Sequence, residues 1–143
     1  MSLTLDFTGR ARFLPMAAQA DYTLIVAVEC ILSDLPPMHA MLDTAAQWSL
    51  LPGRVAQAMG YSTEPDPDTP RYSTRKGSLH GRIEPVRLTF PAELGEAALM
   101  EAPFYICESW DGPVVLGWTG CLECLCFALD ARQYEELFYF GIT

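Results

Sequence analysis

Runs of aliphatic and β-branched residues, separated by glycines, prolines and acidic residues, dominate the hydrophobic pattern of the chain. The clearest run covers residues 22–32, where Thr, Ile and Val are dense enough to favour a strand over a helix. Weaker runs at residues 3–7 and 11–14 lie on either side of Gly9. They predict an N-terminal hairpin or an interface strand.

The next segments alternate between short apolar pieces and turns. Two prolines at residues 36–37 predict a turn, because neither can donate a hydrogen bond to a strand ladder. A short apolar segment, residues 39–42, follows the turn and ends at Asp43. Residues 51–60 have the features of a short helix that ends at a glycine. Residues 62–70 are rich in prolines and acids, which predicts a mobile surface loop without regular structure.

Strand-like alternation returns in the second half of the chain. Residues 71–90 are interpreted as one long hairpin with Gly77 and Gly81 near its tip. Further apolar strands are expected at residues 99–107, 114–116, 126–129 and 137–140, with one short helix at residues 120–125. The pattern as a whole predicts a single all-β domain over residues 1–143, with one or two short helices.

The composition agrees with one folded domain, because half of the 143 residues are hydrophobic. No apolar run approaches the roughly 20 residues that span a bilayer, and the N-terminus lacks the features of a signal peptide. We therefore expect a cytoplasmic protein without a membrane partner. Five cysteines, an odd number, favour reduced thiols over a complete set of disulfides.

The net charge of -9 argues against nucleic acid as a partner, since binding to a phosphate backbone depends on Lys and Arg. Five of the nine Lys and Arg residues nevertheless lie in one stretch, residues 71–87. This positive charge either steers an acidic ligand or keeps an exposed hairpin edge soluble, and both interpretations stay open. The clustered cations are Arg71, Arg75, Lys76, Arg82 and Arg87.

Asp43 is the strongest candidate for chemistry. It lies directly after an apolar strand and before Thr44, Ala45 and Ala46. A carboxylate at the edge of a core costs free energy unless it is hydrogen-bonded. Asp43 is therefore expected either to cap a turn or to be held for a reaction.

Residues 42–46, Leu-Asp-Thr-Ala-Ala, resemble the active-site signature of the retropepsin family of aspartic peptidases, hydrophobic-Asp-Thr/Ser-Gly-Ala. Val115, Leu116 and Gly117, followed by the expected short helix, are similar to the second signature of that family. Residues 71–90 stand where the family carries its flap hairpin, and the closing segments resemble the terminal strands of bacterial members. The resemblance covers residues 22–143 and implies a closed acid-protease barrel.

The resemblance also implies a mechanism and a partner. Each chain would supply one Asp43 to a dyad at the axis of a homodimer, with Thr44 bracing the two loops and Leu116 and Gly117 supporting them. The dyad would activate a water that attacks a peptide or protein substrate, without a metal or cofactor. The flap residues expected to contact this substrate are Thr74, Arg75, Lys76, Gly77 and Ser78.

Ala45 departs from the family pattern, which has glycine at this position. A Cβ here would restrict the backbone and the approach of substrate. The alternative function is therefore a catalytically silent module that uses the same cleft or dimer surface for binding.

Other constellations are weaker. Cys121, Cys124 and Cys126 suggest thiol or zinc chemistry, but their alternation with Leu and Phe is more typical of packing residues. His39 and His80 lack the local motifs of nucleophilic catalysis, and there is no glycine loop for a phosphate. Trp118 is expected in the core or in a hydrophobic dimer interface.

Overall fold

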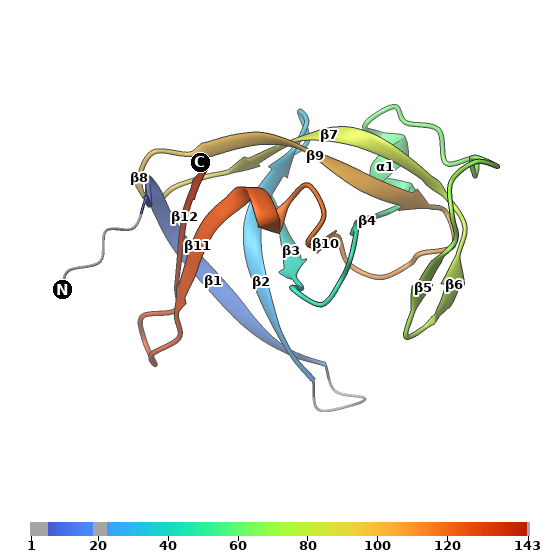
Figure 1. Ribbon diagram of the computed structural model, residues 1–143. Helices are drawn as coiled ribbons and strands as arrows, with labels where there is room; N and C mark the ends of the chain where they lie inside the picture. The colour runs from blue at the N-terminus through green and yellow to red at the C-terminus, as the bar shows by residue number, and fades with distance from the viewer. Residues whose placement is uncertain (1–5, 19–22, 143) are drawn as a thin grey trace.

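The computed structural model describes residues 6–18 and 23–142, which form one mostly β domain (Figure 1). Within the structure, strands make up 52% and helix 7%, so the predicted fold class is confirmed at this level. The N-terminal strand expected at residues 3–7 lies mainly outside the described residues. Its last two residues, Asp6 and Phe7, are not part of a strand.

The centre of the molecule is a closed barrel of six strands. Pairing of Ile31 with Thr89 and of Leu32 with Leu88 closes the ring between its first and last strands. In order around the ring, the strands are β2 (Thr23–Leu32), β3 (Met38–Leu42), β10 (Val115–Leu116), β4 (Ser49–Pro52), β9 (Ala98–Cys107) and β7 (Arg82–Phe90).

A second group of strands is joined to the barrel through β1 (Gly9–Ala18). The first part of β1 pairs with β12 (Leu137–Ile142), and its second part pairs with β2. Outside β12 lies β11 (Leu125–Asp130), and β8 (Leu94–Gly95) pairs with the start of β1. The closing strands predicted near the C-terminus are therefore present, and they hold the N-terminal strand.

Two short helical segments agree with the predicted number. The α-helix α1 (Gly53–Ala58) starts after Pro52, and the chain leaves it at Gly60, whose φ of 84° suits glycine. The 3₁₀ helix η1 (Leu122–Cys124) lies within the predicted residues 120–125. No helix in the described residues is both long and apolar enough to cross a membrane.

The predicted long hairpin over residues 71–90 is wrong in its extent. The hairpin consists of β5 (Tyr72–Thr74) and β6 (Gly77–Leu79), which pair only with each other. The following strand β7 leaves it and pairs with β9 over its whole length. Gly81 lies at this departure and not at the tip of the hairpin. A Cβ at Gly81 would overlap the carbonyl oxygen of Ile106, so the close approach to β9 requires glycine.

Two strands of the structure were not predicted from the sequence. β4 and β8 are too short to produce a clear pattern.

The loop of residues 62–70 contains no helix or strand, as expected, but it is better anchored than its composition suggests. The Asp66 amide donates to the Gly81 carbonyl at 3.0 Å, and the Tyr105 hydroxyl donates to the Pro70 carbonyl at 2.8 Å. Mobility of this loop stays a prediction.

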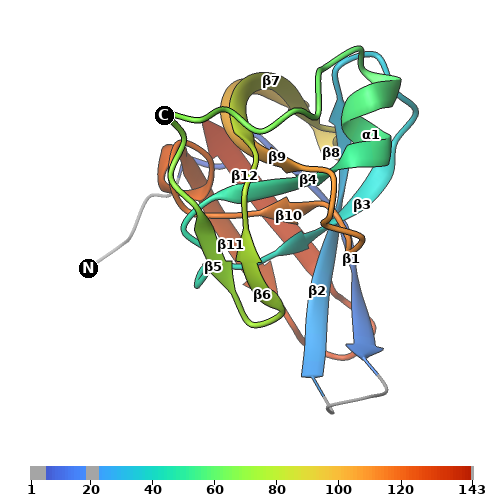
Figure 2. The same cartoon turned by 90° about the vertical axis from the view of Figure 1, so that its right-hand side faces the viewer.

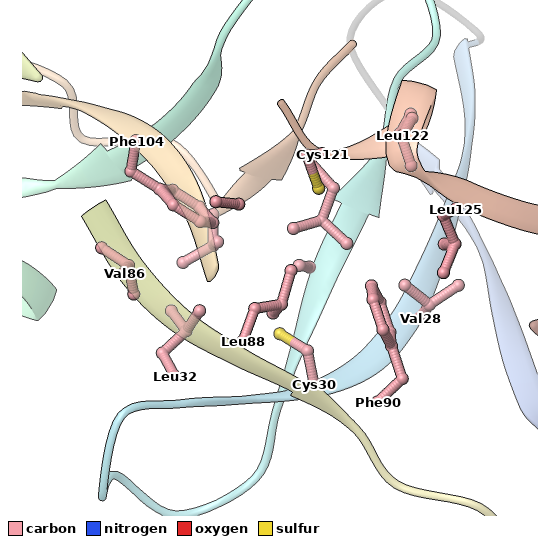
Figure 3. Close-up of a cluster of buried hydrophobic side chains, with 14 of the residues drawn as sticks. Val28, Cys30, Leu32, Val86, Leu88, Phe90, Phe104, Cys121, Leu122 and Leu125 are labelled. Atoms are coloured by element: carbon pink, nitrogen blue, oxygen red, sulfur yellow. The ribbon is translucent and has the colours of Figure 1, made fainter. Parts of the chain in front are cut away.

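Alternating residues of β2 and β7 build the core of the barrel (Figure 3). Val28, Cys30 and Leu32 point inward from β2, and all three are 0% exposed. This spacing of two residues is the period at which a strand returns to the same face. Opposite them lie Val86, Leu88 and Phe90 of β7, together with Phe104, Cys121, Leu122 and Leu125.

Three phenylalanines join the terminal strands to the barrel. The ring of Phe90 lies 5.8 Å from Phe140 and 5.7 Å from Phe138, measured between centroids. All three side chains are at most 2% exposed. We expect Phe140→Ala to lower the free energy of unfolding by about 3–5 kcal/mol, because it removes a buried aromatic side chain and leaves a cavity.

Chemical denaturation monitored by circular dichroism measures this loss. The control is Leu99→Ala on β9, where the side chain is 63% exposed and the expected change is within about 0.5 kcal/mol. Equal effects of the two substitutions would contradict the assignment of Phe140 to the core.

Candidate functional site

Strand β10 lies between β3 and β4, and this insertion shapes the loop that carries Asp43. β10 runs parallel to β3, with Leu116 opposite Leu42, and antiparallel to β4, with Val115 opposite Leu50. The chain between β3 and β4, residues 43–48, must therefore pass around the end of β10. The Asp43 amide donates to the Leu116 carbonyl at 3.0 Å, which fixes the start of this loop.

The loop is a tight turn built on Asp43. The Ala45 amide donates to Asp43 Oδ1 at 2.9 Å, and the Ala46 amide donates to the Asp43 carbonyl at 3.2 Å. The Asp43 side chain is half-buried, whereas Thr44 and Ala45 are exposed. The carboxylate thus has both features expected from the sequence, because it caps a turn and also faces open space.

Leu116 and Gly117 contact the Asp43 loop from behind. A Cβ on Gly117 would lie 2.5 Å from both the carbonyl carbon and the oxygen of Trp48, so only glycine permits this approach. The Gly117 amide donates to the hydroxyl of Ser49 at 2.9 Å, and Ser49 is fully buried. The Trp118 amide donates to the Ala46 carbonyl at 2.8 Å. The structure therefore brings the two predicted signatures together.

A cleft of about 1350 Å³ opens above this loop. The Asp43 loop forms one side of it, the hairpin β5–β6 a second side, and residues 24–26 of β2 a third. Figure 2 shows the hairpin as a separate arm in front of β3, β4 and β10. The apolar lining of the cleft includes Met41, Leu50, Ile83, Tyr105, Trp110 and Val115.

Two contacts hold the hairpin over the cleft. The Tyr72 hydroxyl accepts a hydrogen bond from the Trp48 amide at 3.2 Å, which ties the base of the hairpin to the Asp43 loop. At the tip, the Lys76 ammonium lies 5.5 Å from the centre of the Trp110 ring, a cation–π distance. The Thr74 hydroxyl closes the turn by donating to the Gly77 carbonyl at 2.9 Å.

The predicted flap residues divide into two groups. Thr74, Arg75 and Lys76 line the cleft, as expected of residues that contact a ligand. Gly77 and Ser78 are exposed on β6 and are not among the residues that line it, so their contact with a ligand stays a prediction. They lie on the returning strand of the hairpin, after the turn at Arg75 and Lys76.

Sequence reasoning missed several aromatic residues of the cleft. Trp48, Tyr72, Tyr105 and Trp110 all line it. The position of Tyr72 two residues before Thr74 was a usable signal, since alternate residues of a strand share a face. Trp110 lies on a loop and is held by its indole N–H, which donates to the Pro113 carbonyl at 2.8 Å. Nothing in its local sequence indicates that it reaches the hairpin tip.

Of the three cysteines that the sequence pattern assigned to packing, only Cys121 is buried, whereas Cys124 is exposed and Cys126 is half-buried. Cys30 and Cys121 are 0% exposed, and burial raises the pKa of Cys30 to about 12 and that of Cys121 to about 11. Both therefore stay protonated near neutral pH, where a nucleophile or metal ligand would need the thiolate. Cys124 is exposed on η1, and within the described ranges no three His, Cys, Asp or Glu side chains gather as a metal-binding group.

Comparisons of the chain with protein-family models, with curated proteins and with solved structures found no match in any of the three. The geometry of Asp43 and its cleft and the resemblance of the sequence motifs are therefore the features that bear on function.

Substitution of Gly117 tests the support of the Asp43 loop. We expect Gly117→Ala to lower the free energy of unfolding by about 1–3 kcal/mol, because the new methyl group overlaps backbone atoms of Trp48 that cannot move independently. Thermal or chemical denaturation measures the change.

Gly60→Ala is the matched control. Its added Cβ meets no atom within 4 Å, so the free energy of unfolding should fall only by the strain of a left-handed backbone at a φ of 84°, about 1 kcal/mol. A Gly117→Ala protein that is as stable as the parent would show that β10 does not press against the Asp43 loop.

Proposed function

We propose that the protein is an aspartic endopeptidase of the retropepsin type, active as a homodimer. One observation carries the proposal: a half-buried carboxylate, Asp43, lines a large cleft that has a β-hairpin as another of its sides. The insertion of β10 behind the carboxylate agrees with the pairing of two signatures that the family resemblance implies.

The need for a second chain follows from the acid chemistry. Asp43 is the only carboxylate among the described residues that line the cleft. Activation of water by carboxyl groups requires one ionised and one protonated partner, which a pair of close acids provides by sharing a proton. A symmetric dimer supplies the second acid from the same position of the other chain.

Exposed residues around the Asp43 loop support contact with a second copy. Thr44 and Ala45 are exposed on the loop. Trp118 is 46% exposed and is joined to the loop through its amide. Thr44 would brace the two loops by hydroxyl hydrogen bonds, and the indole of Trp118 would add apolar area beside them.

The proposed reaction is hydrolysis of a peptide bond. The ionised Asp43 takes a proton from water while the water oxygen bonds to the carbonyl carbon of the substrate. The protonated Asp43 of the second chain donates its proton to the carbonyl oxygen. In the tetrahedral intermediate, the first Asp43 gives the proton it took from water to the leaving nitrogen. The C–N bond then breaks while the second Asp43 takes back a proton from a hydroxyl of the intermediate, so the dyad again shares one proton. The substrate would lie extended between hairpin and floor, in the manner of an added strand.

Ala45 is compatible with this chemistry in two respects. The described non-glycine residues with a positive φ are Ser33, Tyr134 and Glu136, so Ala45 has a backbone conformation that alanine adopts without strain. Its amide still holds the Asp43 carboxylate. The second candidate, a silent binding module, rests on the exposed methyl group of Ala45 at the cleft, where it would limit the approach of a substrate carbonyl.

Asp43→Asn tests the catalytic role. With a mixed peptide library between about pH 4 and 7, we expect the parent to cleave and the variant to be slower by about 10²–10⁴-fold, the usual contribution of a general acid–base. The two proteins should have the same circular dichroism spectrum and the same sedimentation as a dimer.

Mixed dimers test whether the two acids come from different chains. If both must be carboxyl groups, only dimers of two parent chains are active, and an equimolar mixture refolded with Asp43→Asn keeps about one quarter of the parent activity. A value near one half would indicate that each chain acts alone. Absence of cleavage by a proven parent dimer would favour the silent module.

Ala45→Gly measures the effect of the departure from the family pattern. We expect kcat/KM to rise by about tenfold, because removal of the exposed Cβ lets the substrate backbone approach the loop more closely. The matched control is Ala128→Gly on β11, outside the cleft, for which kcat/KM should not change. A fall in activity for Ala45→Gly would mean that alanine is the residue for which this cleft is shaped.

A further inference from the structure

The structure separates the clustered cations of residues 71–87 into two groups. Arg82 forms a salt bridge with Glu84 at 2.9 Å, and Arg87 forms one with Asp34 at 2.6 Å. Arg71, Arg75 and Lys76 line the cleft instead. Within residues 6–18 and 23–142, none of these three has an acidic partner within salt-bridge distance.

The cleft is therefore positive inside a negative protein. The chain carries a net charge of -9, yet the cleft lining contains Asp43 as its one described acid against three cations. Charges of one sign around a recess concentrate the electrostatic potential there and attract ligands of opposite charge. All three cations are exposed, so a bound ligand reaches them without displacing an existing ion pair.

The positions of the cations relative to the floor define what they can bind. Arg75 and Lys76 form the turn at the hairpin tip, and the contact of Lys76 with Trp110 holds this charge at the mouth of the cleft. Arg71 lies at the base of the same hairpin. The barrel strands β3, β4 and β10 contribute apolar residues to the same lining, with Met41, Leu50 and Val115.

We propose that the cleft selects extended peptide segments in which acidic side chains flank an apolar centre. The inference rests on the proposed function for the identity of the ligand as a peptide. The apolar residues of the segment would occupy the inner lining, and its carboxylates would pair with Arg71, Arg75 and Lys76. In a symmetric dimer the three cations occur twice, so acids are favoured on both sides of the cleaved bond.

A set of matched peptides tests the selection. Three fluorescein-labelled peptides of about ten residues share one apolar centre and carry Glu, Gln or Lys at the flanking positions. Binding is measured by fluorescence anisotropy on Asp43→Asn, which holds the peptides without cleaving them. At low salt and pH 7 we expect the Glu peptide to bind about tenfold tighter than the Gln peptide, and the Lys peptide to bind most weakly, because each exposed ion pair adds modestly.

The preference should respond to salt and to pH as an ion-pair effect does. Near 1 M salt the Debye length falls to about 3 Å, and the Glu and Gln peptides should bind within about twofold of each other. The same convergence is expected well below pH 4, because the pKa of a free Glu side chain is about 4.3 and its carboxylate is then protonated.

Two variants assign the preference to the hairpin. The double substitution Arg75→Gln with Lys76→Gln should reduce the Glu-to-Gln affinity ratio from about tenfold to about twofold. Arg87→Gln removes one of the same clustered cations outside the cleft and should leave the ratio unchanged. An equal loss in both variants would overturn the assignment, since it would reflect net charge alone.

The outcomes separate this inference from the proposed function. Tighter binding of the Glu peptide without cleavage by the parent supports the inference and contradicts the peptidase. Cleavage without preference for Glu supports the peptidase and overturns the inference. Displacement of the Glu peptide by a single-stranded oligonucleotide at equal concentration would also overturn it, because the cleft would then bind polyanions in general.

Discussion

The insertion of β10 between β3 and β4 is the constraint on which the site depends. It forces the connecting loop around the end of a strand, and the amide of Asp43 is fixed by the Leu116 carbonyl. Gly117 then packs against the backbone of Trp48 at a distance that excludes any side chain. The backbone of the Asp43 loop is thereby fixed by β10, and the carboxylate itself is held by the Ala45 amide of the same loop. Such rigid placement is a general requirement of acid–base catalysis.

Long apolar elements and the position of Asp43 at the end of a strand were predictable from the sequence, because their signals are local. Residues 22–32 and 99–107 correspond closely to β2 and β9, and Asp43 follows directly after β3. The division of residues 71–90 was not predictable, since alternation of apolar and polar residues continues while the pairing partner changes. Likewise, the start of residues 51–60 was assigned to a helix, although Leu51 and Pro52 belong to β4, because four residues carry no readable period.

The aromatic residues of the cleft were even less predictable from the sequence. They come from the Asp43 loop, the hairpin, β9 and the loop that precedes β10. Each looks like an ordinary core residue in its own segment. Only the closed ring brings Trp48 to Tyr72 and Lys76 to Trp110. The basic cluster was predictable in part. The sequence shows where its charges lie along the chain, but only the fold separates them into paired and cleft-lining groups.

The position of β10 in the ring also has a consequence for the order of folding. Leu42 and Leu116 are neighbours in space but 74 residues apart in sequence, and contacts of such separation form late because loop closure opposes them. Until Val115 and Leu116 arrive, β3 and β4 have no strand between them and Asp43 has no backbone anchor. The Asp43 loop therefore takes its final shape only when these late contacts form. A partly folded chain therefore cannot present Asp43 in the arrangement that the complete barrel gives it.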